Sequence, residues 1–415
     1  MQKMVVALLL VLACGTAFGQ DYAGVLNNAP YKIRVPANWN GELLMYAHGY
    51  GYLERWNPAT QFDYSYADAA PGGQVMEDFL LSQGYALAGT VFNGTGWQVK
   101  EGIHNLVSLV GFFNGLVGKP KRTVLIGYSL GSLIAFKSAE DIPLYDGIIA
   151  GCDQGAGTSK GMGLAGDFSL AYATLFNWPS AWGTWYDIKN DIKFYEDVYP
   201  VLLPQITNLQ NFPKFEFMRL LVGMPLQGAY ENPGWMFLGM FMATEARADI
   251  QSRASGPVVQ NANHFYSLTD AQKTYLMSLG MPKGTIDNVL ATMNAQTNVT
   301  VAPRQKRYLG KYFDPTGDLR RPLITMHETG DGLVGVFNET VLADTMKAAG
   351  GEDLLVQTFT NGSWHCGFSA PQLLSTIKAM DFWLDTGTKP GPGFFPETLG
   401  FVPGYAPPQW PIGTK

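Results

Sequence analysis

A serine between two glycines, in a Gly-x-Ser-x-Gly pattern, is the most informative group of residues in this 415-residue chain. Gly127, Ser129 and Gly131 form the pattern, which lies between an apolar, β-branched run at 123–126 and a helical pattern at 133–139. A strand, a tight turn and a helix in that order make a nucleophile elbow, which presents a serine hydroxyl at the carboxyl edge of a sheet. Glycines are needed because side chains beside the strained serine would collide with the strand and the helix. We therefore predict that Ser129 is a nucleophile.

A serine hydroxyl attacks a carbonyl group only when a base takes its proton and a third group orients that base. Among the five histidines, His365 follows the last predicted strand, which makes it the expected base. The acid should lie between the serine and the histidine in chain order, and Asp331, in a glycine-flanked loop, is the favoured residue. Asp153, directly after an earlier strand, is an alternative, and Glu328 is a weaker one.

The other four histidines are assigned structural roles. His48 ends a predicted strand and is expected to stabilise the turn that follows it, while His327 ends the strand before the acid loop. His104 falls within a helical pattern, and His264 lies between the two sheet-forming parts of the chain.

Two backbone N–H groups must stabilise the negative oxygen that forms during such an attack. We expect them from Leu130, which follows the nucleophile, and from Tyr50, with Gly49 or Gly51 as near alternatives. The Tyr50 ring is also placed to line an acyl pocket. This chemistry needs neither a metal ion nor an organic cofactor.

Strand and helix patterns alternate around these residues. Strands are expected at 22–26, 31–36, 42–47, 85–92, 123–126, 146–152, 322–327 and 354–359, and helices at 74–83, 99–117, 133–139, 339–349 and 371–384. This alternation predicts an α/β fold with a mostly parallel central sheet and helices on both faces. Active groups in such sheets lie beyond the carboxyl ends of the strands.

The alternation stops between residues 153 and 320, where helical and irregular stretches carry many aromatic residues. Ten aromatic residues fall between 168 and 199, and a second apolar cluster lies at 235–242. They are either the core of a helical unit or an apolar binding surface over the sheet edge, and both can hold for different residues. We expect a large, mainly helical cap insertion at 153–320.

The cap divides the rest of the chain into a core and a tail. The α/β core is expected at 20–152 and 321–386, because these parts carry the strand and helix patterns. The Pro- and Gly-rich residues 387–415 are expected to form an extended tail laid over the surface.

A signal peptide is predicted at residues 1–19, because the apolar run at 5–13 is followed by small residues before Gln20. The less favoured alternative is a lipoprotein anchored through Cys14. Both place the mature protein outside the cytoplasm, as a secreted or periplasmic protein. No later apolar run is long enough to span a membrane, and a net charge of −6 with no basic face argues against a nucleic-acid partner. The oligomeric state is left open.

Together these motifs resemble those of the α/β-hydrolase superfamily, and its serine esterases in particular. The resemblance rests on the elbow at Ser129, the turn at 48–50, the Asp331 loop and the His365 loop, which occur in the superfamily's order. It covers the two sheet-forming parts of the chain. It implies the fold and the Ser-His-Asp triad, but not the substrate.

A second, weaker resemblance concerns the two cysteines of the mature chain. The pair His365-Cys366 is similar to the tannase and feruloyl-esterase group, in which the catalytic histidine precedes a disulfide-bonded cysteine. The partner cysteine of that group directly precedes the serine, but Tyr128 holds that place here. Cys152, at the same predicted sheet edge, is the remaining partner, and two buried free thiols are the alternative.

These observations predict a secreted serine carboxylester hydrolase that forms an acyl-enzyme. Its substrate would be a small-molecule or polymeric ester with an apolar or aromatic part. Two alternatives remain: a serine peptidase of the same fold that acts on small peptides, and a binding protein of this fold without turnover.

Overall fold

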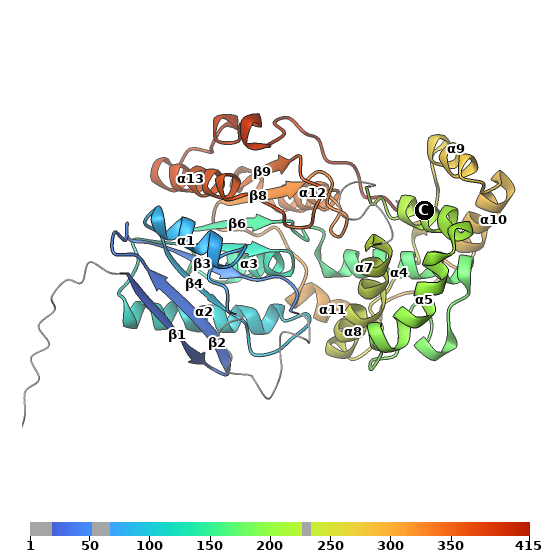
Figure 1. Cartoon of the computed structure of the whole chain (residues 1–415), viewed down its shortest axis with the longest axis horizontal. Coiled ribbons are helices and arrows are strands. Elements are labelled where there is room, and N and C mark those ends of the chain that lie inside the picture. Colours follow the sequence, from blue (N-terminus) through green and yellow to red (C-terminus); the bar gives the residue numbers. More distant parts are fainter. Residues whose placement is uncertain (1–18, 52–66, 226–233) are drawn as a thin grey trace, which may run out of the picture.

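The computed structural model describes residues 19–51, 67–225 and 234–415 (Figure 1). Cys14 and nearly all of the predicted signal peptide lie outside these ranges. Within them, no helix combines the length and the apolar character that crossing a membrane requires.

Among the described residues, eight strands form one sheet in the order β1-β2-β4-β3-β5-β6-β8-β9. Their bounds are β1 (Gln20–Leu26), β2 (Ala29–Val35), β3 (Glu42–Ala47), β4 (Ala86–Thr90), β5 (Arg122–Tyr128), β6 (Gly147–Gly151), β8 (Leu323–Glu328) and β9 (Leu355–Thr360). β2 runs antiparallel to both of its neighbours, and all pairs from β4 to β9 are parallel. This strand order with its single reversed strand is that of the α/β-hydrolase fold, so the predicted fold is confirmed.

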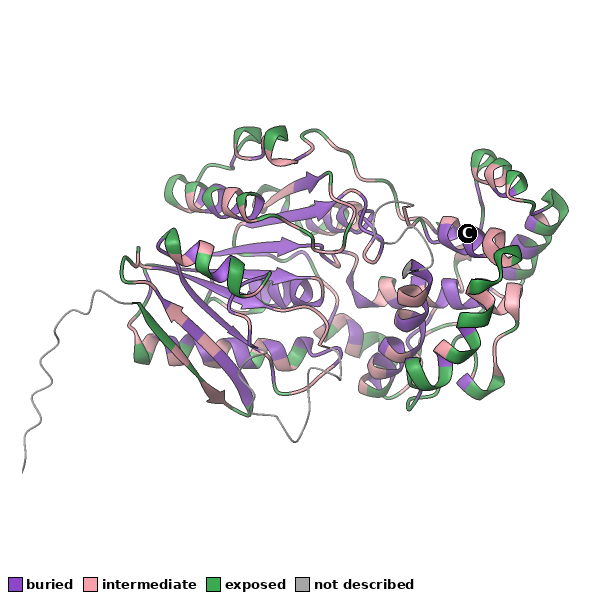
Figure 2. Ribbon diagram, viewed as in Figure 1, coloured by how far each residue is buried: buried purple, intermediate pink, exposed green. Residues whose placement is uncertain are grey.

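Helices cover both faces of the sheet (Figures 1 and 2). One face carries α2 (Val99–Leu116), α3 (Leu130–Asp141) and α12 (Asn338–Ala349), and the other carries α1 (Gln74–Ser82) and α13 (Ala370–Thr386). Successive side chains of a strand point to opposite faces. In β3, for example, Leu43 and Met45 pack on the face covered by α2, α3 and α12. Leu44 and Tyr46 pack on the face covered by α1 and α13.

The segment between β6 and β8 is almost entirely helical and lies beyond the carboxyl ends of the parallel strands (Figure 1). It contains α4 (Gly157–Phe176), η4 (Ser180–Trp182), η5 (Phe194–Val198), α5 (Tyr199–Thr207), η6 (Leu209–Asn211), α6 (Phe212–Leu221), α7 (Gly234–Phe241), η8 (Met242–Ala246), α8 (Arg247–Ala254), β7 (His264–Phe265), α9 (Asp270–Ser278), α10 (Lys283–Asn294) and α11 (Pro303–Tyr312). Most of its aromatic residues fill a separate apolar core, and Tyr186 and Tyr195 are exposed exceptions.

The C-terminal tail runs over the surface and connects the sheet to the helical segment. It contains the short helices η10 (Pro392–Phe394) and η11 (Glu397–Leu399) and buries Phe395 and Phe401 against the α13 face of the sheet. Its end forms β10 (Gly413–Thr414), which pairs with β7 of the helical segment. The tail therefore fastens the helical segment to the core.

Candidate active site

Ser129 lies in the turn between β5 and α3 with a strained backbone, at φ +55° and ψ −122°. The two glycines of the pattern are sterically required. A Cβ atom on Gly127 would lie 2.1 Å from the Gly131 carbonyl oxygen, and one on Gly131 would lie 2.0 Å from the Ala47 carbonyl oxygen. Strand, turn and helix therefore approach each other as closely as the sequence pattern predicts.

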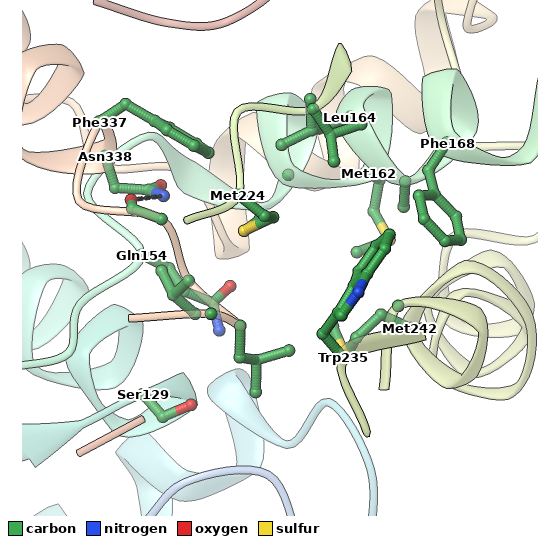
Figure 3. Close-up of a pocket in the computed structure, with 18 of the residues that line it drawn as sticks. Ser129, Gln154, Met162, Leu164, Phe168, Met224, Trp235, Met242, Phe337 and Asn338 are labelled. Atoms are coloured by element: carbon green, nitrogen blue, oxygen red, sulfur yellow. Dashed lines mark hydrogen bonds between the residues drawn. The ribbon is translucent and has the colours of Figure 1, made fainter. Parts of the chain in front are cut away.

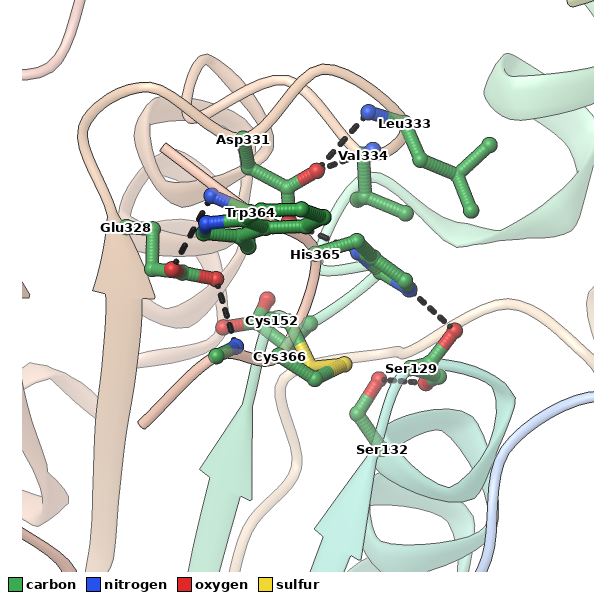
Figure 4. The surroundings of a disulfide bond; sticks show 12 residues. Ser129, Ser132, Cys152, Glu328, Asp331, Leu333, Val334, Trp364, His365 and Cys366 are labelled. Atoms are coloured by element: carbon green, nitrogen blue, oxygen red, sulfur yellow. Dashed lines mark hydrogen bonds and ion pairs between the residues drawn. A yellow bond between two sulfur atoms is a disulfide. The ribbon is translucent and has the colours of Figure 1, made fainter. Parts of the chain in front are cut away.

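The structure brings together the serine, the histidine and the favoured acid of the sequence analysis (Figure 4). The Ser129 hydroxyl lies 2.8 Å from Nε2 of His365, and Nδ1 of that ring lies 2.7 Å from the carboxylate of Asp331. Asp331 is fully buried, and its second oxygen accepts the backbone N–H groups of Leu333 and Val334 at 2.8 and 2.9 Å. A carboxylate held in this way can fix the tautomer and the orientation of an imidazole.

The two alternative acids have other neighbours. Asp153 lies 3.7 Å from Nδ1 of His327, and its other oxygen accepts the N–H group of Gly155 at 2.9 Å. The carboxylate of Glu328 accepts the N–H groups of Trp364 and Gly367 at 3.2 and 2.9 Å, and burial raises the pKa of Glu328. Glu328 therefore accepts hydrogen bonds from residues on both sides of His365 in the loop that carries it. Its position directly after the predicted strand at 322–327 is visible in the sequence, but its partners are not.

The same loop is also held by a disulfide between Cys152 and Cys366, whose Cα atoms lie 5.2 Å apart (Figure 4). Cys152 follows the last residue of β6, so the bond joins the histidine loop to the carboxyl edge of the sheet. The pairing expected from the resemblance is present, and the alternative of two free thiols is wrong for this structure.

The turn after β3 lies against the elbow. A Cβ atom on Gly49 would come within 3.3 Å of the Ser129 Cβ atom. His48 donates from Nδ1 to the Gly49 carbonyl oxygen at 2.7 Å and stacks on Phe92, as expected of a turn-stabilising residue. Tyr50 lines the cavity above the serine. The assignment of the Leu130 and Tyr50 N–H groups to an oxyanion hole remains a prediction.

A cavity lies over Ser129, between the sheet edge and the helical segment (Figure 3). Apolar side chains form most of its wall, among them Met162, Leu164, Phe168, Trp235, Met242 and Phe337. The few polar side chains include Gln154 and Asn338. None of the described residues that line it carries a formal charge. Trp410 of the tail also lines the cavity, and no pattern in the sequence indicates this role.

His327, for which the sequence predicts a structural role, lies buried below the Asp331 loop. Its Nε2 donates to the Val334 carbonyl oxygen at 2.8 Å. Burial by itself lowers the pKa of His327, but the neighbouring carboxylates of Asp153 and Glu339 outweigh it, so that the pKa lies well above its usual value. Burial, reinforced by Asp153, raises the pKa of Glu339 to about 8.

Comparisons with known proteins give distant matches. No family model matches the sequence. The o-phthalyl amidase of Xanthobacter agilis is 21% identical over 427 aligned positions, which cover 90% of this chain and 89% of the amidase.

Among solved structures, an esterase of Pyrococcus furiosus is 12% identical with a TM-score of 0.39, covering 92% of both chains. An esterase of Aspergillus oryzae is 14% identical with a TM-score of 0.41, covering 90% of this chain and 80% of its own. Both TM-scores are below 0.5, so the fold assignment rests on the strand order given above.

Proposed function

We propose that the protein is a serine carboxylester hydrolase that works through an acyl-enzyme. The observation that carries this proposal is the hydrogen-bonded chain from Ser129 through His365 to the buried Asp331, at the floor of an apolar cavity. The strained elbow and the doubly anchored carboxylate support the same conclusion, since a nucleophile and its base must be held in place before the substrate arrives.

In this proposal, the Ser129 hydroxyl attacks the ester carbonyl while Nε2 of His365 takes its proton. Asp331 stabilises the imidazolium that forms, and the N–H groups of Leu130 and Tyr50 hold the oxyanion. His365 then gives the proton to the departing alcohol, which leaves an acyl group on the serine oxygen. Water, activated by the same imidazole, releases the acid and restores the enzyme.

The cavity favours a neutral, apolar substrate. Because no described lining residue carries a charge, a free carboxylate in the acyl group would be desolvated there without a cationic partner. Aromatic and sulfur-containing side chains such as Phe168, Trp235 and Met242 suit an aromatic or branched acyl group. The helical segment thus acts as a cap that supplies the binding surface.

Amide hydrolysis is the second candidate, and the likeness to an amidase over 90% of the chain favours it. The same three residues cleave amides if the imidazole protonates the departing nitrogen. A peptidase that acts on small peptides belongs to this second candidate. A binding protein of the same fold that has lost turnover is the third candidate. We also propose that residues 1–19 direct the protein out of the cytoplasm.

The test compares nitrophenyl esters with nitroanilides of the same acyl groups, using the purified mature protein. We expect the esters to be cleaved and the activity to disappear in Ser129→Ala, whereas the exposed Ser278→Ala retains it. Faster cleavage of the anilides would identify an amidase. Absence of turnover on both the nitrophenyl esters and the nitroanilides would favour the third candidate, a binding protein.

A second comparison tests the cavity. The nitrophenyl ester of benzoic acid should have a kcat/KM at least about 10-fold above that of the ester of phthalic acid that keeps one free carboxylate, because only the latter buries a charge. An equal or higher kcat/KM for the charged ester would contradict the proposed preference.

A further inference from the structure

Three buried polar atoms without a hydrogen-bond partner converge below the acid loop. They are one carboxylate oxygen of Asp153, Nδ1 of His327 and one carboxylate oxygen of Glu339, and all three side chains are fully buried. Nδ1 lies 3.4 Å from the Glu339 oxygen and 3.7 Å from the Asp153 oxygen, and the three atoms lie within 4.8 Å of one another. Buried polar atoms are rarely left unpaired, so this convergence calls for a ligand.

Each of the three side chains has its other polar atom anchored elsewhere. Nε2 of His327 donates to a backbone carbonyl at 2.8 Å, which leaves the lone pair of a neutral ring on Nδ1. The second oxygen of Glu339 accepts from the Thr325 hydroxyl at 2.9 Å and from the Gln357 amide. The second oxygen of Asp153 accepts a backbone N–H group at 2.9 Å. Outer partners of this kind are what orient the ligands of a metal ion.

The spacing and the charge both fit a divalent cation. Four ligands arranged as a tetrahedron at zinc distances are separated by roughly 3.3–3.5 Å, close to the 3.4 and 3.7 Å that separate Nδ1 of His327 from the two carboxylate oxygens. Two buried carboxylates that face one another are costly unless a cation compensates them, and that cation is either the protonated ring of His327 or a metal ion. One divalent ion with a neutral imidazole and two carboxylates gives a neutral cluster, and this mixed nitrogen and oxygen set suits zinc and its first-row relatives better than calcium or magnesium.

We propose that Asp153, His327 and Glu339 bind one divalent transition-metal ion of the zinc type. The ion joins three elements, since the ligands come from the end of β6, from β8 and from α12. Its role is positional. His327 also holds the carbonyl group of Val334, whose N–H group binds Asp331, so the metal steadies the acid of the proposed triad without touching the substrate.

The test measures metal in the untagged full-length mature protein, purified without chelators from zinc-supplemented cells and analysed by inductively coupled plasma mass spectrometry. We expect about one equivalent of metal per chain. Removing it with 1,10-phenanthroline should lower Tm by several degrees, and added zinc should restore Tm. Cobalt added to the stripped protein should give the visible absorption bands of a coordinated ion.

Two variants assign the metal to these residues. Glu339→Gln keeps the size of the side chain and should retain less than about a fifth of the metal, and His327→Asn should do the same. The exposed His104→Asn is the matched control and should bind as the wild type does. The proposal is wrong if the wild-type protein holds only trace metal after incubation with zinc and its Tm is changed by neither the chelator nor zinc. In that case the cluster binds a proton instead of a metal ion. Full metal content in Glu339→Gln would also overturn the proposal.

Discussion

Cys152, at the carboxyl end of β6, is bonded to Cys366, the residue directly after His365. The histidine of the site is therefore one residue away from a covalent link to the central sheet. Glu328 adds two hydrogen bonds to the same loop from β8. A base that must stay within hydrogen-bond distance of a serine gains from such restraints, because small displacements weaken proton transfer.

Removing the disulfide should therefore reduce both stability and turnover. We expect the double variant Cys152→Ala/Cys366→Ala to lose about 3–5 kcal/mol of unfolding free energy, because the bond spans 214 residues of sequence. The kcat should fall more than KM rises, since the loop carries the base and not the substrate pocket. Guanidinium denaturation and ester kinetics measure the two effects. A variant that matches the wild type in both would show that the bond does not restrain the histidine.

Asp331→Asn should leave binding intact but remove turnover. The amide oxygen can still accept from the N–H groups of Leu333 and Val334, but the amide nitrogen then faces Nδ1 of His365 and favours the wrong tautomer. We expect kcat to drop about 10³–10⁴-fold with little change in KM. The exposed Asp344→Asn on α12 is the control. A loss of less than 10-fold would indicate that another carboxylate orients the imidazole.

Gly131→Ala tests the close approach at the elbow. The added methyl group would lie 2.0 Å from the Ala47 carbonyl oxygen, so the protein should lose more than about 3 kcal/mol of stability or fail to fold. Gly111→Ala in α2 is the matched control, because a methyl group there meets no atom within 4 Å. It should stabilise the helix by about 0.5–1 kcal/mol. Equal stability of the two variants, measured by thermal unfolding, would contradict the geometry.

A pH dependence of stability is expected from Glu42 at the start of β3. Burial and the neighbouring Asp381 raise the pKa of Glu42 to about 7, although Arg122 lies 3.1 Å away. The folded protein thus holds this proton more tightly than the unfolded chain, whose carboxyl has a pKa near 4.5. The contribution to stability is complete below about pH 4.5 and is lost as the pH rises to 7.

Glu42→Gln does not titrate and removes this dependence. The unfolding free energy of the wild type minus that of the variant should fall by on the order of 2 kcal/mol between pH 4.5 and pH 8. Urea denaturation at both pH values measures the difference, with the exposed Glu352→Gln as control. A difference that stays constant with pH would show that Glu42 does not titrate in this range.

Much of the sheet and of the site could be predicted because the signals are local. The glycines around Ser129 indicate that strand, turn and helix approach each other closely there. Alternating apolar residues indicate which face of a strand is buried. The order of serine, acid and histidine then leaves few residues to choose from, and the flanking glycines favour Asp331 over Asp153.

The remaining features depend on contacts between distant segments. The sequence suggests Glu328 only as an alternative acid, because nothing near it in sequence shows that its carboxylate reaches Gly367. Glu339 opens a helix in the pattern, and its proximity to Asp153 and His327 arises only when β6, β8 and α12 pack together. Trp410 reaches the cavity because the tail folds back over the helical segment.

The most direct test of the central claim is the reaction of the mature protein with a fluorophosphonate probe, followed by peptide mass spectrometry. One adduct on Ser129 is expected, with labelling slowed strongly in His365→Ala and unchanged in the exposed His104→Asn. An adduct on another residue, or labelling of Ser129 at the same rate without His365, would contradict the claim that these two side chains form an activated pair.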